Sequence, residues 1–107
     1  LLKKEEAKLF LTHTENSDFV VLLDENGKQF TSREFAGKID NWMNSSVKKV
    51  SFFIGGAYGF SDEIYQRANE KMSLSKMTFT HQMIRLFFVE QIYRADQILQ
   101  GKPYHND

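Results

Sequence analysis

The feature that most readily suggests chemistry is the uncharged run SFFIGGAYGF, residues 51–60, in which an apolar stretch ends in glycines. Gly55 and Gly56 follow this apolar stretch, and Gly59 comes three residues later. In an open parallel sheet ligands bind beyond the carboxyl ends of strands, and glycine there lets the backbone approach a ligand closely. The alternative is that the adjacent glycines only turn the chain.

The glycine pattern does not match the common phosphate-binding motifs. A P-loop needs Lys and then Ser or Thr directly after its last glycine, whereas Gly59 is followed by Phe60 and Ser61. The dinucleotide fingerprint needs G-x-G-x-x-G, and GGAYGF provides only G-G-x-x-G. The loop therefore favours a flat or neutral part of a ligand, held by main-chain groups.

A second candidate segment is SLSKMTF, residues 73–79, which joins two predicted elements without a glycine or proline. Ser73, Ser75 and Thr78 offer hydroxyl groups, and the backbone adds further donors and acceptors. The segment is either a second wall of the same pocket or an ordinary edge strand and linker, and its residues alone do not decide between the two.

Two polar pairs fall on single faces of the last predicted helix. His81 and Arg85 are four residues apart, as are Glu90 and Arg94, and such residues are neighbours on a helix. The first pair could contact a substrate, but a backbone-bonded histidine and a paired surface arginine are the more ordinary interpretation. The second pair is interpreted as structural.

Composition narrows the class of protein. The 107 residues suit one domain, and fourteen basic residues balance fourteen acidic ones, which argues against simple electrostatic binding of nucleic acid. There is no cysteine, and the three histidines are scattered, so neither disulfides nor a metal cluster is expected. No apolar run has membrane-spanning length and no signal peptide is visible, so the cytoplasm is the expected location.

The elements that must position these segments alternate between strands and helices. Apolar runs predict buried strands at 19–23 and 47–54, with a turn at Asn26-Gly27. Further elements are a helix tail at 1–11, helices at 31–43, 61–71 and 82–100, and a short strand with a loop at 72–79. This order predicts an α/β fold with a parallel sheet covered by helices on both faces.

Helix boundaries carry clear signals. Thr31 and Glu34 fit a capping box, and Ser61 can cap the next helix. Gly101 and Pro103 mark the end of the last helix. That helix is apolar nearly all round, with Leu-Phe-Phe-Val at 86–89, which predicts that a partner subunit covers one side of it.

Taken together, the motifs resemble a known family. The segments VVLLDENGK, IGG, SLSKMTF, HQMIR, EQIYRA and PYH resemble the bacterial 23S ribosomal RNA (pseudouridine-N3) methyltransferases, the large subunit methyltransferase H family of the SPOUT superfamily. The resemblance covers almost the whole chain. It implies a homodimer, a deep C-terminal trefoil knot and S-adenosylmethionine as the cofactor. Family members usually begin with a further strand–helix–strand unit, so the chain is expected to lack its N-terminal part.

The resemblance also implies which residues form the site. The cofactor-binding residues carried over by motif come from three segments: Leu23, Gly55, Gly56, Leu74, Ser75, Lys76, Met77, Thr78 and Phe79. His105 is the candidate base or orienting group, Tyr104 would position the uracil ring, and His81 and Arg85 would contact RNA. The tail reads HND where the family often has a basic residue after the histidine, which weakens a role for the tail in binding RNA phosphate.

The implied activity is methylation of N3 of a pseudouridine in 23S ribosomal RNA, within the large subunit or the assembled ribosome. A neutral chain fits recognition of an assembled ribosomal surface by shape. Two alternatives stay open, which are methylation of another RNA position from the same cofactor pocket, and a non-catalytic dimeric binding module.

Overall fold

The first strand forms where the sequence is continuously apolar. The computed structural model describes residues 19–55, 60–103 and 105, and its central strand is β1 (Phe19–Gln29). This strand lies between β2 (Val50–Ile54) and β3 (Glu70–Ser73), and both neighbours run parallel to it. The prediction of a parallel sheet is thus confirmed. The helix predicted at 1–11 lies outside the described residues.

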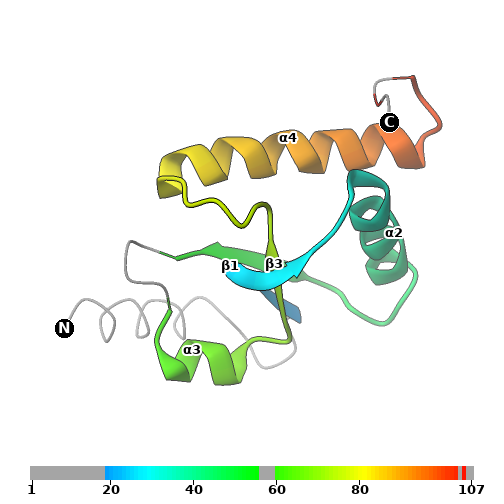
Figure 1. Cartoon of the computed structure of the whole chain (residues 1–107). Coiled ribbons are helices and arrows are strands. Elements are labelled where there is room, and N and C mark those ends of the chain that lie inside the picture. The colour runs from blue at the N-terminus through cyan, green and yellow to red at the C-terminus, as the bar shows by residue number, and fades with distance from the viewer. Residues whose placement is uncertain (1–18, 56–59, 104, 106–107) are drawn as a thin grey trace.

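Helices cover both faces of this sheet, as Figure 1 shows. The helices α2 (Ser32–Met43) and α4 (His81–Leu99) lie on one side, and α3 (Asp62–Arg67) lies on the other. This arrangement confirms the expected α/β layers. Within the described part of the chain, no helix combines the length and the apolar character that crossing a membrane would require.

Alternation along β1 builds two cores from one apolar run. Val21 and Leu23 belong to the core under α2 and α4, whereas Val20 and Leu22 belong to the core with Ile64 of α3. Successive strand residues point to opposite faces, so a strand covered on both sides must be apolar at every position. The unbroken apolar run at 19–23 therefore indicates that both faces of this part of β1 are buried.

The end of β1 departs from the prediction of a simple turn at Asn26-Gly27. The strand continues to Gln29 with a shift in register, so that Leu23 and Lys28 both pair with Met72 of β3. A Cβ on Gly27 would lie 2.7–2.8 Å from the Met72 backbone. Glycine is needed because the curved end of β1 passes directly against β3, as the bend of β1 in Figure 1 suggests.

Two predicted boundaries are wrong for the same reason. The helix expected to reach residue 71 ends at Arg67, and β3 begins at Glu70. Between them Asn69 binds Val20, donating its backbone N–H to the Val20 carbonyl and accepting the Val20 N–H on its side chain, both at 2.8 Å. Pairing with the central strand therefore overrides the local helical pattern.

The predicted caps agree with the structure. The Thr31 hydroxyl accepts the backbone N–H of Glu34 at 3.1 Å, and the Glu34 carboxylate accepts that of Thr31 at 2.8 Å, which completes a capping box. Ser61 caps α3, and Gly101 has φ +71° just after α4. The second strand begins at Val50 rather than at residue 47, and α4 begins one residue earlier than expected.

The helix α4 presents apolar residues on two sides. On its inner side Phe88 packs against Phe35 and Phe52, with ring centroids 5.9 and 4.7 Å away. On its other side Leu86 is 61% exposed and Val89 is 59% exposed. The described chain thus leaves one apolar face of α4 uncovered.

Candidate functional site

The chain path through the sheet creates a place for a ligand. From β1 the chain crosses to β2 through α2 on one face, and it then returns past β1 to β3 through α3 on the other face. Parallel crossovers are right-handed, so reversing the direction of travel moves the connecting helix to the opposite face. At such a reversal the loops after the strands separate, and ligands bind in the crevice between them.

A pocket of about 860 Å³ lies at this edge of the sheet. Its lining includes Leu23, where the pairing of β1 with β2 ends, Gly55 directly after β2 and Leu74 directly after β3. Pockets for cofactor-sized ligands commonly have volumes of roughly 300–1,000 Å³. Three segments that are far apart in the sequence therefore share one pocket of suitable size.

Most of the residues implied as cofactor-binding meet here, although their role stays a prediction. The pocket is lined by Leu23, Gly55, Leu74, Ser75, Met77, Thr78 and Phe79. Lys76 is exposed and is not among the lining residues, and Gly56 lies outside the described residues. His81 lines the rim, whereas Arg85, one turn further along α4, does not.

Gly55 has a packing reason in addition to the predicted approach of a ligand. A Cβ built on Gly55 would lie 3.1 Å from the ring of Phe60, which is tighter than nine in ten real contacts of this kind. Phe60 is buried against Val20, Leu22 and Ile64 on the α3 side of the sheet. The missing side chain at Gly55 thus leaves room for the ring of the core residue Phe60.

Hydroxyl groups in the segment 73–79 hold the segment itself. The Ser73 hydroxyl donates to the Ser75 carbonyl at 2.7 Å, and the Ser75 hydroxyl accepts the Met77 N–H at 3.0 Å. The Thr78 hydroxyl donates to the Glu25 carboxylate at 2.8 Å, which ties this segment to the end of β1. The sequence suggested that these hydroxyls contact a ligand, whereas in the structure they form hydrogen bonds that hold the segment 73–79 in place.

One contact in the pocket lining was not anticipated from the sequence. The Tyr65 hydroxyl of α3 donates to the carboxylate of Asp24, which directly follows the buried part of β1. Burial, followed by the hydrogen bond and charge of Asp24, raises the pKa of Tyr65 to about 12. The hydroxyl therefore keeps its proton and remains a donor at neutral pH. The sequence signal for this contact was the acidic Asp24 directly after the apolar run 19–23, but its partner Tyr65 lies 41 residues away.

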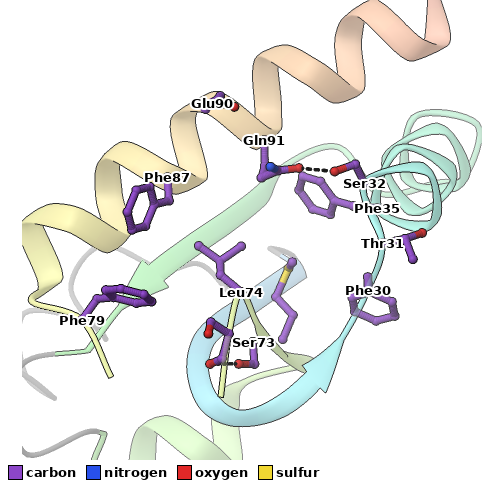
Figure 2. Close-up of a pocket in the computed structure, with 12 residues that line it drawn as sticks. Phe30, Thr31, Ser32, Phe35, Ser73, Leu74, Phe79, Phe87, Glu90 and Gln91 are labelled. Atoms are coloured by element: carbon purple, nitrogen blue, oxygen red, sulfur yellow. Dashed lines mark hydrogen bonds between the residues drawn. The ribbon is translucent and has the colours of Figure 1, made fainter. Parts of the chain in front are cut away.

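A second, smaller pocket lies on the α2 and α4 side, and Figure 2 shows its lining residues. Its volume is about 440 Å³, and Ser73, Leu74 and Phe79 line it together with residues of α2 and α4. The Ser32 hydroxyl donates to Gln91 at 2.7 Å, which links the two helices there. The segment 73–79 thus separates two pockets of different size.

The candidate base does not lie with the cofactor residues. Nδ1 of His105 lies 3.1 Å from Nη1 of Arg94, and Arg94 forms the expected ion pair with Glu90 at 2.8 Å. Thirteen residues separate Arg94 from His81 on the pocket rim, about 20 Å along a helix. Within one chain His105 therefore lies at the end of α4 remote from the pocket, and Tyr104 lies outside the described residues.

A metal centre has no counterpart in the part of the chain that the structure describes. Across residues 19–55, 60–103 and 105, no group of three or more His, Asp or Glu side chains could hold a metal ion. The lining of the larger pocket includes Asp24, Glu25 and His81 and, among the described residues, neither lysine nor arginine. Such a lining suits a cationic or neutral ligand better than a phosphate.

The fold and site thus define an α/β protein with a ligand pocket beyond the ends of parallel strands. A family model described as "Predicted SPOUT methyltransferase" matches residues 1–105. The chain belongs to the SPOUT methyltransferase family.

Curated relatives are similar over nearly the whole of this chain. A protein of Christiangramia forsetii is 60% identical over 104 residues, 97% of this chain and 66% of the relative. Proteins of Cytophaga hutchinsonii and Bacteroides thetaiotaomicron are 55% and 56% identical, over 99% and 98% of this chain and 68% and 67% of the relatives. All three are named Ribosomal RNA large subunit methyltransferase H. The chain spans about two thirds of the length of these relatives.

Proposed function

We propose that the protein is an S-adenosylmethionine-dependent methyltransferase that methylates N3 of a pseudouridine in 23S ribosomal RNA. Its substrate is the large subunit or the assembled ribosome, which places its work in the cytoplasm. The observation that carries the proposal is the convergence of Leu23, Gly55 and Leu74 on one pocket. The relatives' names add the class of substrate.

The pocket lining fits this cofactor. Leu23, Ile54 and Leu74 supply apolar walls for an adenine ring, and the loop backbone offers hydrogen-bonding groups. Asp24 and Glu25 at the end of β1 place negative charge beside a ligand that carries a cationic sulfonium. The cofactor would supply an activated methyl group, so the protein's part is binding and orientation.

Residues of the chain must also help to remove a proton from the substrate. N3 of pseudouridine carries a proton that must leave, and a base within hydrogen-bond reach would accept it. We assign His105 as this base or as an orienting group, and Tyr104 as the residue that positions the uracil ring. His81, on the pocket rim, and Arg85, one turn further, would contact RNA.

A homodimer reconciles these roles with the position of His105. Within one chain His105 contacts Arg94, about 20 Å along α4 from the pocket rim. In a dimer the tail of one subunit would complete the pocket of the other. The exposed apolar side of α4, which includes Leu86 and Val89, provides a surface for such a contact.

The proposed fold of the whole protein includes the trefoil knot of its family. Its support is membership of the SPOUT methyltransferase family. An experimental structure of the whole protein would test this point directly.

The test is methyl transfer to purified large subunits and ribosomes that lack the modification, with the methylated nucleotide mapped by mass spectrometry. Methylation of N3 of a pseudouridine supports the proposal, and methylation elsewhere assigns a different RNA target. Failure to bind S-adenosylmethionine would indicate a non-catalytic module. The variant His105→Ala should lower the transfer rate by about 10²–10⁴-fold while retaining cofactor binding. An unchanged rate would exclude His105 as an essential group.

A further inference from the structure

The end of β1 is joined to the helix on the α3 side by a pair of polar side chains. Both oxygens of the Asp24 carboxylate are engaged, because Oδ1 accepts the backbone N–H of Asn26 at 2.9 Å and Oδ2 accepts the Tyr65 hydroxyl. Both Asp24 and Tyr65 are partly buried and line the larger pocket. The chemistry proposed above uses only the charge of Asp24 and gives Tyr65 no role.

A continuous series of contacts runs from this pair to Gly55, on the β2 side of the pocket. The ring of Tyr65 packs edge-on against Phe60 with ring centroids 5.9 Å apart. The ring of Phe60 in turn occupies the space beside Gly55, where a Cβ would approach it to 3.1 Å. The order of contacts is therefore Asp24, Tyr65, Phe60 and Gly55, from the end of β1 to the end of β2.

The two ends of this series belong to opposite walls of one pocket. Leu23 immediately precedes Asp24 and forms the β1 wall, and Gly55 forms the β2 wall. Pairing of β1 with β2 fixes Leu23 opposite Ile54 and ends there, whereas β1 stays paired with β3 up to Gln29. Beyond Leu23 and Ile54, the described contacts that link the β1 side of the pocket to Gly55 run through the side chains of Asp24, Tyr65 and Phe60.

We propose that Asp24 and Tyr65 form a positioning pair that sets the spacing between the Leu23 and Gly55 walls for a flat nucleoside. The proposal rests on the proposed function, because it assumes that the pocket binds the adenosyl part of the cofactor. Tyr65 acts through Phe60 and Gly55. Loss of its hydroxyl would leave Oδ2 of Asp24 without its donor and would free the Tyr65 and Phe60 rings to shift relative to Gly55.

The chemistry at this contact favours a lasting hydrogen bond between Tyr65 and Asp24. The raised pKa of Tyr65, about 12, keeps the hydroxyl protonated, and the ring also lies 5.2 Å from Nζ of Lys71. Hydrogen bonds to charged groups are stronger than neutral ones, so a single hydroxyl can hold two elements together. The hydroxyl thus remains a donor to Asp24 at neutral pH.

The test is calorimetric titration of the whole protein with S-adenosylhomocysteine, using Tyr65→Phe, Asp24→Asn and the double variant. Each single variant should weaken binding about 10-fold, with one site per chain retained. In the double variant the dissociation constant should rise by no more than about 20-fold over that of the unaltered protein, because both changes remove the same interaction. Asp40→Asn, the same chemical change on the exposed face of α2, is the matched control and should leave the dissociation constant unchanged.

Kinetics separates positioning from plain stability. In methyl-transfer assays Tyr65→Phe should raise KM for the cofactor and leave kcat within about threefold. A purely structural role would lower the melting temperature and the active fraction at an unchanged dissociation constant, and that result would overturn the proposal. If the unaltered protein fails to bind the ligand, the proposed function itself falls and the pair falls with it. Binding by the unaltered protein and equal binding by Tyr65→Phe would overturn the pair alone.

Discussion

The two sides of α4 have similar composition and opposite surroundings. Phe88 on the inner side is 9% exposed and packs between Phe35 of α2 and Phe52 of β2. Leu86 and Val89 on the other side are 61% and 59% exposed. The inner side is explained by the fold of a single chain, whereas the outer side is not.

This difference separates the apolar residues that the fold of one chain buries from those that it leaves exposed. A helix that is apolar nearly all round is normally buried, and the described chain buries only one side of α4. The extensive contacts of α4 with other described elements are with α2 and β2. A second subunit would supply the missing cover, in agreement with the proposed homodimer.

The largest effect is expected on the inner side. Phe88→Ala removes a ring from the aromatic cluster with Phe35 and Phe52 and leaves a cavity, which should cost about 3–5 kcal/mol of unfolding free energy. Urea denaturation followed by circular dichroism measures this change. A loss below about 1 kcal/mol would show that the inner side is not the core of the domain.

On the outer side, a charge should break assembly and spare the fold. Val89→Asp would place an unpaired carboxylate in the proposed subunit interface and should weaken dimerisation by at least about 100-fold. Sedimentation equilibrium measures the dimer constant, and circular dichroism of the monomer should keep its helical signal. Asn41→Asp adds the same charge on the exposed side of α2 and serves as the control. An unchanged dimer constant in Val89→Asp would show that this side of α4 is not part of the interface.

Two glycines sharpen the contrast between crowded and open positions. Gly27→Ala should destabilise by about 1–3 kcal/mol, because the new Cβ meets the Met72 backbone at 2.7 Å. Gly37→Ala, in α2 with nothing within 4 Å, should instead stabilise by about 0.5–1 kcal/mol. Chemical denaturation of both variants tests the pair, and equal effects would contradict the close passage of β1 over β3.

The smallest effect concerns the start of α2, which packs against the inner side of α4. Hydrogen bonds from the backbone and the hydroxyl of Thr31 lower the pKa of Glu34 below its usual 4.5. The folded state therefore binds this proton less readily than the unfolded state, so the stabilisation is complete above pH 4.5 and is lost as pH falls through the folded pKa. Glu34→Gln should flatten that part of the stability profile, measured by denaturation between about pH 2.5 and 6. An identical slope in both proteins would contradict this role.

Local patterns predicted much of the fold, and long-range pairing decided the rest. The apolar run at 19–23 and the Thr31–Glu34 capping box indicated a buried strand and a helix start, and both are present. The turn signal at Asn26-Gly27 instead marks where β1 bends over β3, because pairing with Met72 outweighs a local preference. In the same way β3 takes residues that the local pattern assigned to α3.

The site was predictable to a similar degree. Strand ends and motif resemblance indicated that Leu23, Gly55 and the segment 74–79 would meet, and the pocket lining brings most of them together. The Asp24–Tyr65 pair depends on how α3 lies against β1, which no local pattern encodes. The position of His105 beside Arg94 was likewise invisible, because it depends on the path of the tail after α4.

The most direct test of the central claim is an experimental structure of the protein with S-adenosylmethionine bound. The account predicts the adenosyl group in the larger pocket, in contact with Leu23, Gly55 and Leu74. Binding in the smaller pocket between α2 and α4 (Figure 2), or on a surface that shares none of the three strand ends, would contradict it.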